Sequence, residues 1–162
     1  FLGLPEPLPD NAWISRYFVF KGRNMAKLQA VIAMTLDGSI PAESEPLMEW
    51  IQSDRNGFPY WRGRSTMYLH PGYPLVDLIC EKDSAGSSTV FHTEIYDEES
   101  VEFLRGLSLY SLVDELAIFL IPSVSTFPLS VSAHLPSGKW RLINSRTFRN
   151  GVCRLHYCRT LQ

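Results

Sequence analysis

The chain has 162 residues, of which 45% are hydrophobic and 20% charged, with 15 basic and 17 acidic side chains and a formal net charge of −2. This length predicts one globular domain with a proper core. The balanced charge gives no basic footprint for nucleic acid or an anionic membrane surface. No apolar run approaches the roughly 18 residues of a membrane span, and no signal-peptide pattern is found.

The N-terminal segment predicts an appendage to the main domain. Residues 1–12 carry three prolines, which favour an extended arm over a helix or a sheet interior. Residues 13–20 are aromatic and β-branched and predict a strand, followed by a turn over 21–24. We expect this strand to form a hairpin with residues 27–35. The predicted division is an arm with an extra strand over 1–24 and a main α/β domain over 25–162.

The next segment predicts a buried strand that ends in polar side chains. Leu28–Met34 is rich in Val, Ile and Ala, as in strands that are buried on both faces. Thr35, Asp37, Gly38 and Ser39 follow at its carboxyl end, where ligands bind in open α/β sheets. An alternative stays open: Asp37 could simply satisfy its own backbone in an Asp-Gly turn.

The middle of the chain predicts short elements. We expect a helix over 47–53, a turn over 54–59 and strands over 74–80 and 89–93. Tyr60–Thr66 places aromatic residues beside two arginines, a pattern that could hold a phosphate or could be a solvated surface loop. Asp97 is a suitable N-cap for an acidic helix start, and Gly106 suits its C-terminus.

The C-terminal part predicts a second central strand and a hairpin. Glu115–Ile121 is as apolar as the first buried strand. Residues 140–146 and 152–158 face each other across Asn150-Gly151, a strong hairpin signal. The three cysteines have no C-x-x-C spacing, which predicts a reducing, cytoplasmic setting, and the four histidines are scattered singly, so no metal site is predicted.

Several of these pieces, in order, resemble one known family. Ala33-Met-Thr-Leu-Asp-Gly-Ser-Ile40 resembles the A-x-S-L-D-G-K-I of the reductase domain of bifunctional riboflavin-biosynthesis deaminase–reductases, relatives of dihydrofolate reductase. Glu49–Ser53 resembles the following W-I-T-S, and Gly63-Arg-Ser-Thr66 the G-A-G-T or G-R-K-T. Leu112–Leu116 resembles L-V-D-E-L, and Ser145–Tyr157 the terminal hairpin.

The resemblance implies a dihydrofolate-reductase-like, three-layer α/β fold: a mixed, mostly parallel sheet with helices on both faces and a C-terminal β-hairpin. It implies a homodimeric, NADPH-dependent reductase of a small pyrimidine-type heterocycle, similar to 5-amino-6-(5-phosphoribosylamino)uracil reductase. Carried over by position, Thr35 and Asp37 would be the catalytic residues. The other roles fall to two sets: cofactor-binding Ala33, Gly38, Gly63, Arg64, Ser65 and Thr66, and substrate-binding Glu49, Trp50 and Ser53.

The chain also departs from the family. The family has an E-G-G turn before a helix, where glycines let the cofactor phosphates approach the backbone, and an L-G-x-G after the second central strand. This sequence has no Gly-Gly, and Pro122–Pro128 has no glycine. The second hypothesis is therefore a non-catalytic member of the same fold that acts as a ligand-binding or assembly protein.

Overall fold

The computed structural model describes residues 26–125 and 129–160. The predicted arm and the strand over 13–20 lie outside these residues. The described part contains six strands, namely β1 (Lys27–Thr35), β2 (Met67–Tyr68), β3 (Val90–Ile95), β4 (Glu115–Ile121), β5 (Trp140–Thr147) and β6 (Cys153–Arg159). It contains the helices α2 (Pro46–Ser53), α3 (Phe58–Gly63), α4 (Leu75–Ser84) and α5 (Glu98–Leu109), and the 3₁₀ turn η1 (Ser132–His134).

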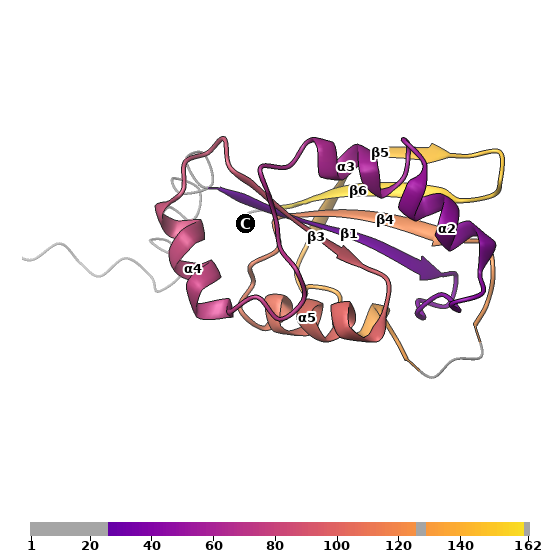
Figure 1. Ribbon diagram of the computed structural model, residues 1–162, viewed down its shortest axis with the longest axis horizontal. Helices are drawn as coiled ribbons and strands as arrows, with labels where there is room; N and C mark the ends of the chain where they lie inside the picture. The colour runs from indigo at the N-terminus through magenta and orange to yellow at the C-terminus, as the bar shows by residue number, and fades with distance from the viewer. Residues whose placement is uncertain (1–25, 126–128, 161–162) are drawn as a thin grey trace, which may run out of the picture.

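The strands form one mixed sheet in the order β2-β3-β1-β4-β6-β5. β1 lies at its centre and pairs in parallel with β3 and with β4, while β6 runs antiparallel to both β4 and β5. Helices α2 and α3 cover one face, and α4 and α5 cover the other (Figure 1). This arrangement confirms the three-layer fold with two buried central strands and a closing hairpin.

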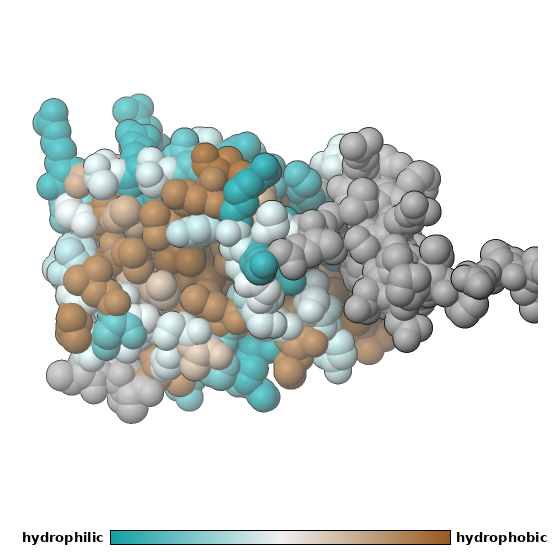
Figure 2. Space-filling model, turned by 180° about the vertical axis from the view of Figure 1, so that it is seen from behind, coloured by the Kyte–Doolittle hydropathy of each residue, from teal (hydrophilic) through white to brown (hydrophobic). Residues whose placement is uncertain are grey.

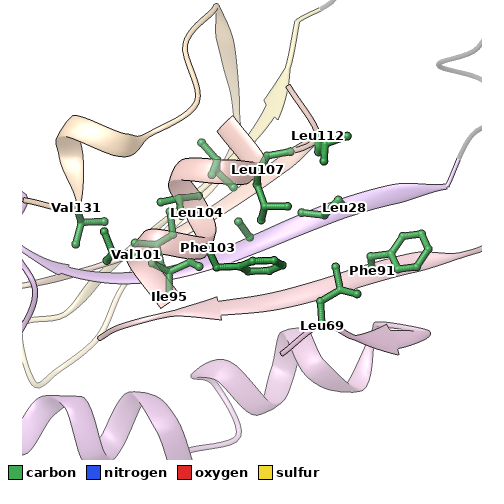
Figure 3. Close-up of a cluster of buried hydrophobic side chains, with 14 of the residues drawn as sticks. Leu28, Leu69, Phe91, Ile95, Val101, Phe103, Leu104, Leu107, Leu112 and Val131 are labelled. Carbon is green, nitrogen blue, oxygen red and sulfur yellow. The ribbon is translucent and has the colours of Figure 1, made fainter. Parts of the chain in front are cut away.

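The core consists of two layers because β1 is apolar on both faces. Leu28, Ala30 and Ile32 point into the larger cluster with α4 and α5, which Figure 3 shows around Leu104 and Leu107. The smaller cluster lies on the opposite face, where α2 and α3 pack on Phe119 and its neighbours. Parallel strands that are buried on both sides are expected to read as continuous apolar runs, as β1 and β4 do.

The structure corrects the prediction of a hairpin between residues 13–20 and 27–35. Both edges of β1 are already taken, by β3 from Lys27 to Ile32 and by β4 from Gln29 to Thr35. A strand over 13–20 therefore has no free edge on β1 with which to pair.

Two helices were misread from the sequence. Residues 74–80, predicted as a strand, form most of α4, and residues 58–63, predicted as turn and loop, form α3. Gly106 does not end α5, which continues to Leu109. A Cβ at Gly106 would lie 2.8 Å from Leu75 Cδ1, so this glycine lets α4 approach α5. No helix among the described residues is long and apolar enough to cross a membrane.

Candidate functional site at the carboxyl edge of the sheet

The turn after β1 is joined to the segment that follows β4. Leu36 N–H donates to Ser123 O at 2.9 Å, and Ser125 N–H donates to Asp37 Oδ1 at 3.2 Å. Parallel neighbours place their carboxyl ends at the same edge of a sheet, so these two loops meet there. The two loops at the edge where the sequence predicts a ligand are therefore joined to each other by hydrogen bonds.

The Asp37 carboxylate is exposed and accepts three local hydrogen bonds. Thr35 Oγ1 donates to Oδ1, and Ser39 Oγ donates to Oδ2 at 3.0 Å. The bond from the Thr35 hydroxyl, with those from Ser125 N–H and Ser39, lowers the pKa of Asp37 below its ordinary value. A carboxyl with a lowered pKa is a poor proton donor near neutral pH. The geometry is that of an Asp-Gly turn, which is the alternative interpretation of this stretch of sequence.

Gly38 allows a close approach, but a protein segment uses it. Its φ is +75°, and a Cβ there would lie 2.5 Å from the Ser132 side chain. Val131 N–H and Ser132 N–H both donate to Gly38 O, at 2.7 and 3.0 Å. The space that the resemblance reserves for a cofactor at this glycine is filled by the segment around η1.

The start of α5 occupies the position of the expected glycine turn after a strand. Asp97 Oδ1 accepts the Ser100 N–H at 2.9 Å, and Ser100 Oγ accepts the Asp97 N–H at 3.0 Å, which makes a reciprocal capping box. Glu98 and Glu99 add two carboxylates to the first turn. A helix N-terminus attracts phosphate through its free N–H groups and the positive end of its dipole. Here three carboxylates already balance that positive charge.

A hollow of about 850 Å³ lies along α5, beside the start of α4 and the 129–134 segment. Its lining includes Glu98, Glu99 and Glu102, and Arg105 is already paired with Glu102 at 2.6 Å. The size suits a small molecule, but the acidic lining opposes a ligand that carries phosphates. The carboxylates of Glu98 and Glu99, which lie where β3 ends, therefore do not suit the phosphates of NADPH.

The structure separates the predicted cofactor residues into two groups. Gly63 ends α3 and Arg64 caps it, whereas Thr66 N–H donates to Val90 O at 2.8 Å, at the start of β3. Gly63, Arg64, Ser65 and Thr66 thus lie at the amino edge of the parallel strands, opposite Thr35 and Gly38. Ala33 is fully buried in the smaller core cluster, so its side chain offers no surface to a ligand.

The predicted substrate residues lie on α2. Ser53 Oγ donates to Glu49 O at 2.8 Å within the helix, and Glu49 is exposed. Trp50 packs edge-on against Phe148, with ring centroids 5.0 Å apart, so its ring points to the loop between β5 and β6. Their role in substrate binding stays a prediction.

A buried polar network under α3 was not predicted. His92 Nε2 lies 2.7 Å from Glu94 Oε2, and Arg62 donates to the same carboxylate through Nε and Nη2 at 3.0 and 2.9 Å. The Gln29 amide nitrogen donates to Trp61 O and lies 2.9 Å from His92 Nδ1. Nδ1 is then the acceptor and Nε2 carries the proton. The sequence contains one indication of this network: His92 and Glu94 alternate with the apolar Phe91 and Ile95 along β3.

A second cluster joins β4 to β6. The ligand atoms of Glu115, His156 and Cys158 lie within 4.8 Å of one another. Lys27 Nζ is 3.4 Å from Glu115 Oε1, and His156 Nε2 is 3.3 Å from Oε2. Burial, with the adjacent Glu115, raises the pKa of the Cys158 thiol. The Lys27 ammonium supplies the positive charge that this carboxylate requires.

Comparison with known proteins supports the fold through structure. No model of a protein family and no curated protein matches the sequence. The structure is similar to one described as a riboflavin biosynthesis protein from Shewanella sp. PV-4, with a TM-score of 0.56 and 15% identity over 83% of this chain and 99% of that one.

Two longer proteins contain a similar region. The diaminohydroxyphosphoribosylaminopyrimidine deaminase/5-amino-6-(5-phosphoribosylamino)uracil reductase of Thermotoga maritima matches with a TM-score of 0.58, 12% identity and 90% of this chain. RibD of Acinetobacter baumannii matches with a TM-score of 0.52, 14% identity and 84% of this chain. The matches cover 59% and 58% of those two chains. These similarities confirm the fold that the sequence resemblance implied, that of dihydrofolate-reductase-like riboflavin-biosynthesis proteins.

Proposed function

We propose that this protein is a non-catalytic member of the reductase fold that binds a ligand and does not use NADPH. The observation that carries the proposal is the start of α5, where Asp97, Glu98 and Glu99 follow the end of β3. A dinucleotide would bring its own negative phosphates to these carboxylates. The loop after β1 is also hydrogen-bonded to the segment after β4, through Asp37 and Gly38.

The test is a titration of the purified protein with NADPH, followed by energy transfer from its four tryptophans and by calorimetry. We expect no saturation up to about 1 mM, a binding free energy weaker than about −4 kcal/mol. The double variant Glu98→Gln, Glu99→Gln removes the repulsion and should bind NADPH more tightly than the wild type. The matched control Glu43→Gln changes an exposed carboxylate on the loop before α2 and should have no effect.

The second candidate is an NADPH-dependent reductase of a pyrimidine-type heterocycle, such as 5-amino-6-(5-phosphoribosylamino)uracil. One observation favours it: the similarity in fold extends over 99% of the Shewanella chain. On this hypothesis NADPH binds saturably at micromolar concentration and is oxidised when the uracil derivative is added. That result would overturn the non-catalytic proposal.

The homodimer implied by the resemblance is part of the proposal, and we place it on β5 and β6. In the sheet of the described residues β5 is an edge strand, and its Leu142 and Ile143 are 49% and 46% exposed. Leu155 and Tyr157 of β6 are only partly buried against the larger core cluster. Figure 2 shows a broad apolar area on the face seen from behind. Exposed apolar areas and unpaired edges are typical of protein interfaces.

A further inference from the structure

Two arginines, Arg64 and Arg154, lie over two aromatic rings where α3 meets the hairpin of β5 and β6, and the guanidinium carbon of a third, Arg146, lies 4.9 Å from the centre of the Phe148 ring. The guanidinium carbons of Arg64 and Arg154 lie 5.3 and 5.9 Å from the centre of the Tyr60 ring, and 5.7 and 5.6 Å from that of Trp61. Arg146 stands directly opposite Arg154 across the hairpin. We call Arg64, Arg146 and Arg154 the arginine cluster.

The arginine cluster is rich in donors and poor in acceptors. Arg154 Nε and Trp61 Nε1 are buried and have no hydrogen-bond partner among the residues that the structure describes. The acceptors that the cluster does have are uncharged: Asn144 for Arg154 at 2.9 Å, Asn56 for Arg146 at 3.3 Å and the Tyr60 hydroxyl for Arg64 at 3.0 Å. Buried donors without acceptors are rare in folded proteins because each loses its bond to water.

The charge of the cluster is not balanced either. No carboxylate in the described ranges 26–125 and 129–160 lies within 4.0 Å of these three guanidinium groups, whereas Arg62 and Arg105 each pair with a glutamate. Burial lowers the pKa of Arg154; Tyr60 opposes this effect, and the nearby Arg146 and Arg64 add to it. Like charges directly opposite each other in a hairpin are destabilising. The arrangement stores repulsion that a bound anion would relieve.

We propose that the arginine cluster binds a phosphate group of a small molecule. Phosphate offers several acceptor oxygens, and guanidinium groups bind it through paired N–H donors. Tyr60 and Trp61 hold the guanidinium groups of Arg64 and Arg154 by cation–π contact, and Phe148 holds that of Arg146. The overall charge of −2 favours a small phosphorylated ligand over a nucleic acid. This assignment rests on the proposed ligand-binding role and locates it on the hairpin of β5 and β6, which is separated from β1 by β4.

The experiment titrates the full chain with inorganic pyrophosphate and with inorganic phosphate at low salt, read by tryptophan fluorescence and by the melting temperature. We expect pyrophosphate to saturate and to raise the melting temperature. Arg154→Gln and Arg146→Gln should each weaken binding about tenfold or more, the loss expected for a charge-assisted hydrogen bond. Arg154→Lys keeps the charge and should retain part of the affinity.

The matched control is Arg149→Gln, which changes an exposed arginine on the same hairpin and should keep the wild-type affinity. The proposal is overturned if pyrophosphate does not saturate, or if Arg154→Gln binds it as the wild type does. Binding of a single-stranded oligonucleotide, but not of pyrophosphate, in an Arg154-dependent manner would also overturn it. If NADPH binds and its binding persists in Arg154→Gln, the proposed function is overturned. The proposal for the arginine cluster is not affected by that result, because pyrophosphate binding tests it separately.

Discussion

Replacing Gly38 by alanine tests whether this glycine serves the fold. Alanine at a φ of +75° enters the left-handed region, at a cost of about 1–2 kcal/mol. Its Cβ would also lie 2.5 Å from Ser132 Cβ and Oγ, and such overpacking costs about 1–3 kcal/mol. The lower entropy of the unfolded alanine chain returns up to about 1 kcal/mol. We expect a net loss of about 1–5 kcal/mol, which at its upper end is a large part of the stability of a typical domain.

The two contributions can be separated with variants at Ser132. Ser132→Gly removes both clashing atoms, so the double variant should recover about 1–3 kcal/mol as a coupling energy. Ser132→Ala keeps the Cβ at 2.5 Å and is the matched control, which should recover little. Urea unfolding followed by tryptophan fluorescence gives each free energy of unfolding.

Two results would refute this reasoning. One is an unfolding free energy of Gly38→Ala that equals the wild-type value. The other is the absence of coupling with Ser132→Gly, because the contact at 2.5 Å would then have no energetic meaning. If Gly38→Ala instead abolished NADPH binding and left stability intact, the glycine would serve a cofactor.

Two further predictions concern the buried network and the sheet face. Glu94→Gln should lower stability at pH 7 by about 2 kcal/mol, because Arg62 and His92 lose a charged acceptor. Burial raises the pKa of Glu94, but its hydrogen bonds to His92 and Arg62 outweigh burial and lower it. The carboxylate therefore stabilises the fold above its unfolded pKa and loses this effect as pH falls through the folded pKa. The unfolding free energy of Glu94→Gln should consequently fall less with decreasing pH than that of the wild type. An equal fall in both proteins would contradict the prediction. Leu142→Asp should convert a homodimer to a monomer in analytical ultracentrifugation. The control Val76→Asp changes an exposed side chain of α4 and should not. A monomeric wild type would disprove the dimer.

The central strands and the hairpin could be predicted because local signals and tertiary packing agree there. Val31 and Ile32 lie in a run that is apolar throughout, which suits a strand between two layers of helices. Asn150-Gly151 closes the hairpin, with Gly151 at a φ of +93°. Asp97 caps α5 as its sequence context indicates. In each case the local preference and the fold require the same backbone.

Helix α4 was missed because its composition favours strands, although its spacing favours a helix. Leu75, Leu78 and Ile79 contact the larger core cluster, which is a helical spacing of three and four. Strand alternation would have buried Asp77 between Leu75 and Ile79. The structure leaves Asp77 exposed in the first turn of the helix. The position of Asp77 therefore favours a helix over a strand for this segment.

The arginine cluster could be predicted only in part. The Asn150-Gly151 turn fixes the register that sets Arg146 opposite Arg154. Nothing in the spacing brings Arg64 to the same place, because its position depends on α3 packing Trp61 against the face that carries His156. The stretch Tyr60–Thr66 carries a phosphate hypothesis from the sequence, and the proposed cluster joins its Arg64 to two arginines of the hairpin.

Two of the residues that carry the family resemblance, Asp37 and Gly38, are also required by the fold. The turn after β1 needs a positive φ at Gly38, room for Ser132 and a short acceptor at Asp37 for the neighbouring loop. Each requirement holds whether or not a cofactor is present. A phosphate cradle, by contrast, requires glycines only while phosphates approach the backbone. The fold therefore explains why this chain keeps the first motif, and it places no such requirement on the second.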